Sequence, residues 1–132
     1  YPGMAEVGNM RLPQKLLKKG IRDMIRISDA RMSGTAYGTV ILHTAPEAAI
    51  KGPLAAVQND DLIEVDVEKG SMNLLVDTDI IKKRLENYKP VLPDIKSGYQ
   101  KMYIDHVTQA DTGADLDFLI GKRGSEVKRH SH

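Results

Sequence analysis

LIEVDV (residues 62–67) is the stretch that decides the fold, because apolar and acidic residues alternate along it. A period of two is typical of a strand with one face turned to a core. The segments at residues 59–61 (NDD) and 69–70 (KG) predict turns on either side. We therefore expect neighbouring strands at residues 54–57 and 72–76.

Further elements are predicted on both sides of this region. The β-branched run TVILH, residues 39–43, is typical of a buried strand. Asp77 or Thr78 can cap a helix over residues 79–88, whose apolar residues recur at helical spacing. Also expected are a helix at 13–19, a short strand at 21–27, one helical turn at 46–49 and a helix at 99–109. Short strands separated by glycine turns favour a mixed β/α fold, with a small barrel-like sheet and peripheral helices, over a doubly wound sheet.

Composition excludes several classes of protein. The 132 residues contain 19 Lys and Arg against 18 Asp and Glu, so a net charge of +1 gives no reason to expect nucleic acid or an anionic membrane as partner. No apolar run approaches the roughly 20 residues of a membrane helix. Cysteine is absent, so this chain has no disulfide and no thiolate for zinc or an iron–sulfur cluster. Without a secretory signal near residue 1, we expect a cytoplasmic protein and leave a mitochondrial location open.

Two loops contain more glycine and polar residues than a simple turn needs. The first is PGMAEVGN (residues 2–9), in which the carboxylate of Glu6 could bind a hard cation. The second is SDARMSGT (residues 28–35), in which Gly34 allows the backbone beside Ser33 to approach a ligand closely. From these residues alone, two ordinary turns remain the alternative.

Several motifs in the same order resemble one enzyme family. The run ISDARMSGTAYGTVILHTAPEAA (residues 27–49) is similar to a signature of the dihydroxy-acid and phosphogluconate dehydratases. PGMAEVGN resembles their Gly-Met-Pro-Glu motif, with Ala5 where proline is common, and GPLAAVQNDDLIEVDV (residues 52–67) also fits. Residues 98–121 and the RMSGTAY motif look like the sugar-acid branch, although relatives there tend to carry a cysteine near Ala114.

The resemblance implies a hydro-lyase that converts 2,3-dihydroxy sugar acids into 2-keto-3-deoxy acids. Residues 1–120 would then be its C-terminal swivelling domain and residues 121–132 a disordered basic tail. The missing N-terminal domain would be its partner, holding an iron–sulfur cluster and most ligands of a magnesium ion. We expect the intact enzyme to be a homo-oligomer, and the isolated fragment to hold no cofactor and to be inactive.

The resemblance also implies roles for particular residues. Ser33 matches the serine that takes the proton from C2 of the substrate. Thr35 matches a hydroxyl that binds the substrate carboxylate, and Gly34 keeps the loop tight. Glu6 matches the carboxylate that this domain contributes to magnesium in the intact enzyme.

Other polar residues have both a functional and a structural interpretation. Asp29 and Arg31 could pair and hold the serine loop from behind, or be simple surface charges. His43 could line the site, although a histidine at the end of an apolar strand is more often buried and hydrogen-bonded; His106 presents a similar choice. The aspartates between residues 111 and 117 match no calcium loop, so docking or capping is expected of them.

A domain that packs on a larger partner should leave apolar side chains exposed. We expect an apolar, mobile surface beside the two loops, formed by Met4, Met10, Met32 and Tyr37.

Two other functions are open at this stage. The chain could be a stand-alone β module that binds a protein or a small ligand without catalysis. It could also belong to a dehydratase of branched-chain amino-acid synthesis, which substrate profiling would separate from a sugar-acid enzyme.

Overall fold

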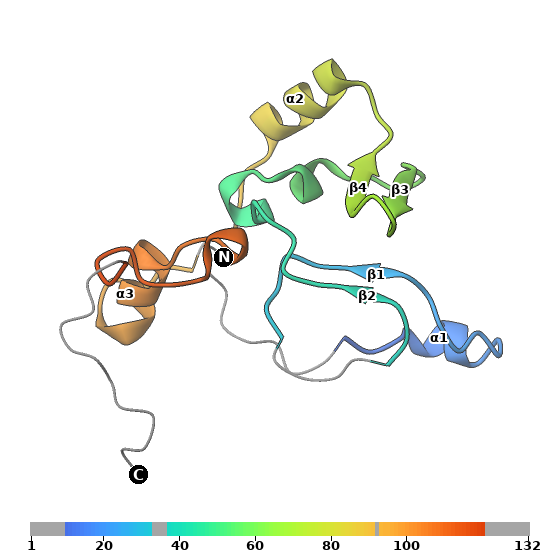
Figure 1. The fold of residues 1–132 in the computed structure, drawn as a ribbon, viewed down its shortest axis with the longest axis horizontal. Helices are drawn as coiled ribbons and strands as arrows, with labels where there is room; N and C mark the ends of the chain where they lie inside the picture. The colour runs from blue at the N-terminus through green and yellow to red at the C-terminus, as the bar shows by residue number, and fades with distance from the viewer. Residues whose placement is uncertain (1–9, 33–36, 92, 121–132) are drawn as a thin grey trace, which may run out of the picture.

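The computed structural model describes residues 10–32, 37–91 and 93–120. Its elements are short, and they follow one another as strands and helices mixed along the chain (Figure 1). In chain order they are α1 (Gln14–Leu17), β1 (Arg26–Ile27), β2 (Val40–Ile41), η1 (Ala48–Ile50), η2 (Pro53–Ala56), β3 (Ile63–Asp66), β4 (Ser71–Leu74), α2 (Thr78–Asn87), α3 (Gly98–His106) and η3 (Ala110–Thr112), where η marks a 3-10 helix.

The strands form two separate pairs. β1 and β2 are parallel, with Arg26 opposite Val40, and they run side by side in Figure 1. β3 and β4 form an antiparallel hairpin, with Ile63 opposite Leu74. The expected mixed α/β class is confirmed. The described residues close no barrel, so the barrel-like form stays a prediction.

The helix predicted at residues 79–88 is confirmed as α2. Asp77 caps it, because its carboxylate accepts a hydrogen bond of 2.9 Å from the amide of Asp79. Arg84 attaches the helix to the preceding chain by donating to the Ala56 carbonyl at 3.0 Å and to the Asp61 carboxylate at 2.6 Å. α2 therefore packs against η2.

The prediction of a strand at residues 54–57 is wrong, because this segment is the 3-10 helix η2. Pro53 occupies its first position, where the fixed φ of proline suits a helical turn and no amide hydrogen is needed. Gly52, just before it, is buried against the Pro46 carbonyl, and a Cβ there would also lie 2.9 Å from the Glu47 carbonyl oxygen. The backbone at Gly52 approaches that of Pro46 and Glu47 so closely that only glycine fits there.

Few apolar side chains are buried among the described residues. Ala30, Met32 and Ala56 are buried, whereas Val67 is 88% exposed. The alternating pattern of residues 62–67 thus correctly predicts strand β3, but the described residues leave much of its apolar face uncovered.

The expected apolar surface beside the loops is confirmed only in part. Tyr37 is 71% exposed and Met10 is half-buried. Met32 is buried, so the prediction is wrong for this residue, and Met4 lies outside the described residues.

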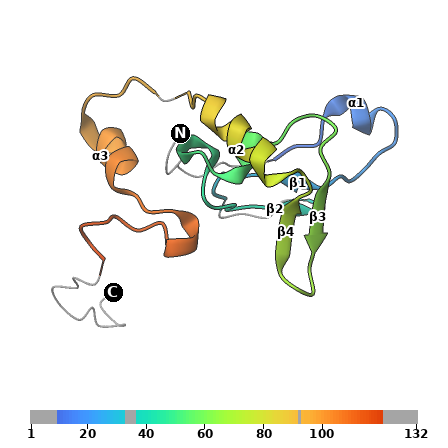
Figure 2. The ribbon, with the colours of Figure 1, turned by 90° about the horizontal axis from the view of Figure 1, so that it is seen from above.

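The two ends of the described chain lie far apart. α1 and α3 are at opposite ends of the molecule in Figures 1 and 2. After α3, the chain turns back on itself through a bridge between Val107 and Leu116. None of the helices in residues 10–32, 37–91 and 93–120 is long and apolar enough to cross a membrane.

Candidate functional site

The residues with predicted chemical roles lie just outside the part of the chain that the structure describes. Glu6 falls within residues 1–9, and Ser33, Gly34 and Thr35 fall within residues 33–36. The basic tail at residues 121–132 lies outside it as well. The structure does describe the chain on both sides of residues 33–36, so the candidate site is built from these two flanking stems: residues 28–32 and residues 37–41.

Backbone hydrogen bonds join the first stem to the end of β2 and to the chain just after it. The amide of Ser28 donates to the Ile41 carbonyl at 2.9 Å, and the amide of His43 donates to the Ala30 carbonyl at 3.2 Å. The Ser28 hydroxyl accepts a hydrogen bond of 3.0 Å from the Ala30 amide, which fixes a local turn. The short parallel pairing of β1 and β2 is therefore prolonged toward the segment that carries Ser33.

Arg31 anchors the first stem to two distant parts of the chain. Its side chain is 9% exposed and pairs with the Glu47 carboxylate, which is 3% exposed, at 3.0 Å. The same guanidinium donates to the Tyr103 hydroxyl and to the Thr108 carbonyl, each at 2.9 Å. The Glu47 amide in turn donates to the Gln109 side chain at 2.8 Å. A buried ion pair thus connects the first stem, the turn at η1 and the segment after α3.

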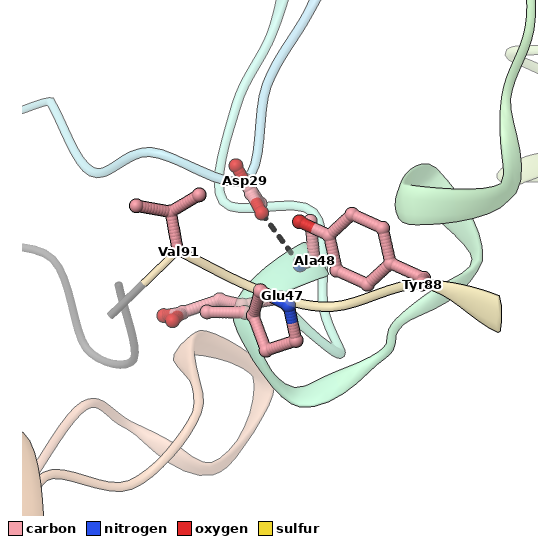
Figure 3. A pocket seen from close by; sticks show the side chains of 7 residues that line it. Asp29, Glu47, Ala48, Tyr88 and Val91 are labelled. Carbon is pink, nitrogen blue, oxygen red and sulfur yellow. Dashed lines mark hydrogen bonds between the residues drawn. The ribbon is translucent and has the colours of Figure 1, made fainter. Parts of the chain in front are cut away.

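The predicted pairing of Asp29 with Arg31 is wrong, because each residue has another partner. Asp29 accepts a hydrogen bond of 2.6 Å from the amide of Ala48, the first residue of η1 (Figure 3). Asp29 and Glu47 line a cavity of about 230 Å³, together with Tyr88 and Val91. Neither acid is thus a simple surface charge.

His43 does not occupy the buried position that its strand suggested. The residue is exposed, and its φ of 57° lies in the left-handed region, so the chain turns just after β2. Its Nε2 atom lies 3.3 Å from the carbonyl oxygen of Met32, the residue directly before Ser33. His43 therefore contacts the first stem, and its role in lining the site stays a prediction.

Arg26 holds the second stem and is a residue that the sequence interpretation missed. It is 8% exposed, and its side chain donates to the carbonyl oxygens of Met10, Met24 and Tyr37. The sequence offered one sign that Arg26 is buried, which is its place in the strand-like segment MIRI (residues 24–27). A buried arginine in such a segment needs hydrogen-bond partners. Glu47 was missed as well, since nothing in its flanking sequence indicates burial.

One carboxylate beside the second stem has a shifted pKa. Asp23 accepts hydrogen bonds from the amides of Thr39 at 3.1 Å and Met24 at 2.8 Å. These bonds, the first above all, lower the pKa of Asp23 below its ordinary value, and the charge of Arg26 acts in the same direction. The Asp23 side chain is 46% exposed and lies 3.9 Å from the Arg26 guanidinium.

The described residues alone do not fit a metal ion or cluster. Within residues 10–32, 37–91 and 93–120, no three His, Cys, Asp or Glu side chains gather as metal ligands would. Of the aspartates between residues 111 and 117, Asp117 lies 3.0 Å from His106, and the docking or capping expected of this group stays a prediction. Phe118 contacts the same histidine edge to face, so His106 belongs to this structural contact.

The comparisons with known proteins identify the family. The family model for the C-terminal domain of dihydroxy-acid/6-phosphogluconate dehydratases matches residues 1–114. The chain belongs to this family. L-arabonate dehydratase of Azospirillum brasilense is 61% identical over the whole of this chain, which spans 24% of that protein. L-arabinonate dehydratase of Rhizobium leguminosarum bv. trifolii is 59% identical over the whole of this chain, which spans 23% of that protein.

A more distant relative supports the same branch of the family. D-xylonate dehydratase of Caulobacter vibrioides is 38% identical over the whole of this chain, which spans 22% of that protein. The resemblance to the sugar-acid branch is thereby confirmed. The chain spans about a quarter of the length of these curated relatives.

Proposed function

We propose that this chain is the C-terminal domain of a longer hydro-lyase that removes water from 2,3-dihydroxy sugar acids to give 2-keto-3-deoxy acids. One observation carries the proposal: similarity to sugar-acid dehydratases extends over the whole chain, at 61% identity to an L-arabonate dehydratase. A five-carbon sugar acid of the arabinonate type is the substrate that this similarity favours.

Within this proposal, the predicted site residues act on the substrate from the segments beside the two stems. Ser33 removes the proton at C2, and Thr35 binds the substrate carboxylate beside Gly34. A serine hydroxyl serves as a base only as an alkoxide, and that form needs positive charge nearby. Support comes from the first stem, where a buried ion pair and a network of hydrogen bonds hold the chain directly before Ser33.

The proposed cofactors need ligands beyond the described residues. With no cysteine in the chain, an iron–sulfur cluster held by thiolates requires another part of the protein. Glu6 would be the contribution of this domain to a magnesium ion, which supplies Lewis-acid stabilisation of negative charge when it is bound. The exposed apolar side chains, including Val67 and Val91, suit a domain that packs against the rest of such a protein.

The test uses the full-length protein, produced without oxygen. The formation of 2-keto acids would be measured for pentonates, hexonates and dihydroxyisovalerate. We expect wild type to prefer a pentonate and Ser33→Ala to lose activity while the contents of metal and cluster stay unchanged. Ser71→Ala, the same substitution on β4 in the hairpin, is the control that should keep full activity.

Three outcomes would contradict the proposal. Unchanged activity in Ser33→Ala would remove this serine from the mechanism and make His43, next to the first stem, the residue to test. Preference for dihydroxyisovalerate would place the protein in branched-chain amino-acid synthesis. The purified 132-residue chain should show no dehydration, and measurable turnover by that chain would contradict the division of labour between domains.

A further inference from the structure

A cavity lies between the hairpin β3–β4, strand β1 and the 3-10 helix η2. Its volume is about 130 Å³, and its walls are mostly apolar, with Ile27, Leu54, Ile63, Met72 and Leu74 among them. None of these five residues is fully buried in the structure. Part of the apolar wall is therefore open to contact from outside.

The wall continues along one face of the hairpin. Ile63 lies opposite Leu74, and Val65 lies opposite Met72. Alternate residues of a strand lie on the same side, so these four residues share one face, on which Val65 is 37% exposed. Val67, in the turn directly after β3, extends the apolar series and is 88% exposed. These five residues are called the hairpin face below. In Figure 2 the hairpin projects beyond its neighbours, so this face runs from the cavity toward solvent.

Within the strands, the opposite side of the hairpin is polar. Glu64 lies opposite Asn73 and accepts a hydrogen bond of 3.3 Å from its side-chain amide, and both residues are exposed. Water solvates such a surface well, whereas apolar side chains gain free energy when they leave water. The hairpin face is therefore the side that a partner would cover.

The described chain gives the hairpin little support. A two-stranded hairpin alone is marginally stable in water, and it needs further strands or a helix packed against it. α2 packs on η2, and no helix within residues 10–32, 37–91 and 93–120 packs closely on β3 or β4. The stability of the hairpin thus depends on additional contacts.

A buried hydroxyl indicates the chemistry of the partner. Thr44 also lines the cavity, and its Oγ1 atom is buried without a hydrogen-bond partner among the described residues. Such an unpaired group is costly. Polypeptide backbone carries an N–H donor and a C=O acceptor at almost every residue, whereas hydrocarbon carries neither. A polypeptide segment with apolar side chains would therefore suit both the hydroxyl and the walls.

Polypeptide of this kind is available in the proposed longer protein, because the chain spans only 24% of the L-arabonate dehydratase and 23% of the L-arabinonate dehydratase. We propose that the cavity and the hairpin face together bind an apolar segment of the same longer protein, from outside these 132 residues. The inference rests on the proposed function, because it requires the remainder of that protein.

The test compares wild type and two variants of the full-length protein. Val67→Lys places a charge on the hairpin face, and Asn73→Lys, the matched control, places the same charge on the opposite side of the same hairpin. Carbene footprinting would measure the labelling of Val65 and Val67 relative to the urea-unfolded protein. Hydrogen exchange would be measured in peptides that cover residues 62–75.

We expect Val67 of wild type to be labelled far less than its exposed fraction of 88% in the 132-residue chain would give, because the partner segment covers it. Val67→Lys should speed exchange across the hairpin by at least about tenfold, the ratio that corresponds to the loss of one buried valine side chain. Asn73→Lys should exchange like wild type. Should Val67→Lys not fold, Val67→Thr keeps the shape of the side chain but adds a hydroxyl, and it should change exchange in the same direction.

Three results would overturn the inference. Full labelling of Val67 in wild type would show that the hairpin face is uncovered in the intact protein. Equal exchange in Val67→Lys and Asn73→Lys would show that the hairpin gains no stability from this face. Labelling that rises on dilution, as light scattering shows subunits to separate, would mean that a second copy covers the face.

The measurements also separate this inference from the proposed function. Footprinting and exchange need no turnover, so they decide whether the hairpin face is covered even if the protein dehydrates no sugar acid. An enzyme that dehydrates pentonates but has a fully labelled hairpin face would leave the proposed function in place and remove this inference alone.

Discussion

The two stems that flank residues 33–36 are both held by a buried arginine, but by different chemistry. Before the segment, Arg31 forms an ion pair with Glu47 and reaches Tyr103 and Thr108, which are 72 and 77 residues away. After the segment, Arg26 holds Tyr37 through a backbone carbonyl. Arg31 thus connects parts of the domain that are far apart in the sequence, whereas the hydrogen-bond partners of Arg26 all lie within 16 residues of it.

This difference indicates which stem matters for stability and which for geometry. An ion pair removed from water makes each partner dependent on the other, since loss of one leaves an uncompensated charge. Arg26 lies 3.9 Å from the Asp23 carboxylate, a longer ion pair than that of Arg31 with Glu47 at 3.0 Å, and its hydrogen bonds go to neutral carbonyl oxygens. We therefore expect changes around Arg31 to act mainly on unfolding, and changes around Arg26 to act mainly on the geometry of the second stem.

The largest effect is expected for Glu47→Gln, which keeps the size of the side chain but removes its charge. The Arg31 guanidinium would then stay buried without its carboxylate, at a cost of about 3–5 kcal/mol. Hydrogen exchange of the domain's amides in the full-length protein would measure the loss. Glu64→Gln, on exposed strand β3, is the control and should change stability by less than about 0.5 kcal/mol.

A double variant separates the pair from the individual charges. Arg31→Met combined with Glu47→Leu removes both ions, and it should cost much less than the sum of the two single changes because no charge is left alone. Additive costs would mean that the two residues stabilise the domain independently, and the contrast between the two stems would disappear.

Gly38→Ala should have the next largest effect, and it acts on the second stem. The φ of Gly38 is +80°, and a Cβ there would lie 2.7 Å from Asp23 Cγ and 3.1 Å from Arg26 Nη2. The left-handed backbone alone costs about 1–2 kcal/mol for a residue with a Cβ. Displacement of Asp23 and Arg26 adds to this cost and should also impair turnover.

Gly70→Ala is the matched control for this substitution. Gly70 has a φ of +62° in the β3–β4 turn, and a Cβ there would have no neighbour within 4 Å. The control therefore carries the backbone cost alone and should leave turnover unchanged. Equal losses of stability and equal turnover in the two variants would show that Asp23 and Arg26 tolerate displacement.

A smaller effect is expected from acid, through Asp23. The Thr39 amide, first among its partners, lowers the pKa of Asp23 from its ordinary value of 3.8. A carboxyl whose folded-state pKa is lowered stabilises the folded protein fully above about pH 4, and this contribution is lost as the pH falls through the folded-state pKa. Hydrogen exchange of the second stem between pH 5 and pH 3, corrected for intrinsic rates, should show local opening in wild type and a flatter profile in Asp23→Asn. The same slope in both proteins would exclude Asp23 as the titrating group.

The sequence predicted the local features of this fold better than its long-range contacts. The Asp77 cap, helix α2 and hairpin strands β3 and β4 depend on neighbouring residues, and the pattern of residues 59–88 contains that information. Residues 54–57 were misassigned because an apolar run of four residues does not distinguish a strand from a helical turn after proline.

The anchors of the two stems could not be predicted for a different reason. Arg26 binds backbone carbonyls, which every residue possesses, so no side-chain type marks its partners. Glu47 and Arg31 are 16 residues apart, and Asp29 was a nearer acid on the same loop. Only the folded chain shows that Asp29 instead accepts a hydrogen bond from Ala48.

The smallest effect expected is that of Ser28→Ala, which tests whether the first stem also depends on local contacts. The Ser28 hydroxyl accepts one hydrogen bond, from the Ala30 amide at 3.0 Å, and an average hydrogen bond contributes about 1 kcal/mol. Ser28→Thr keeps the hydroxyl and is the control. If Arg31 and Glu47 determine the position of the stem, Ser28→Ala should lower stability by this small amount. Turnover should stay within about twofold of wild type, because the stem keeps its position; a tenfold loss would need a change of about 1.4 kcal/mol in the barrier. A large loss of turnover at nearly unchanged stability would mean that the hydroxyl orients the chain before Ser33. The first stem would then act through geometry as the second does, and the distinction between the two arginines would no longer describe how the loop is held.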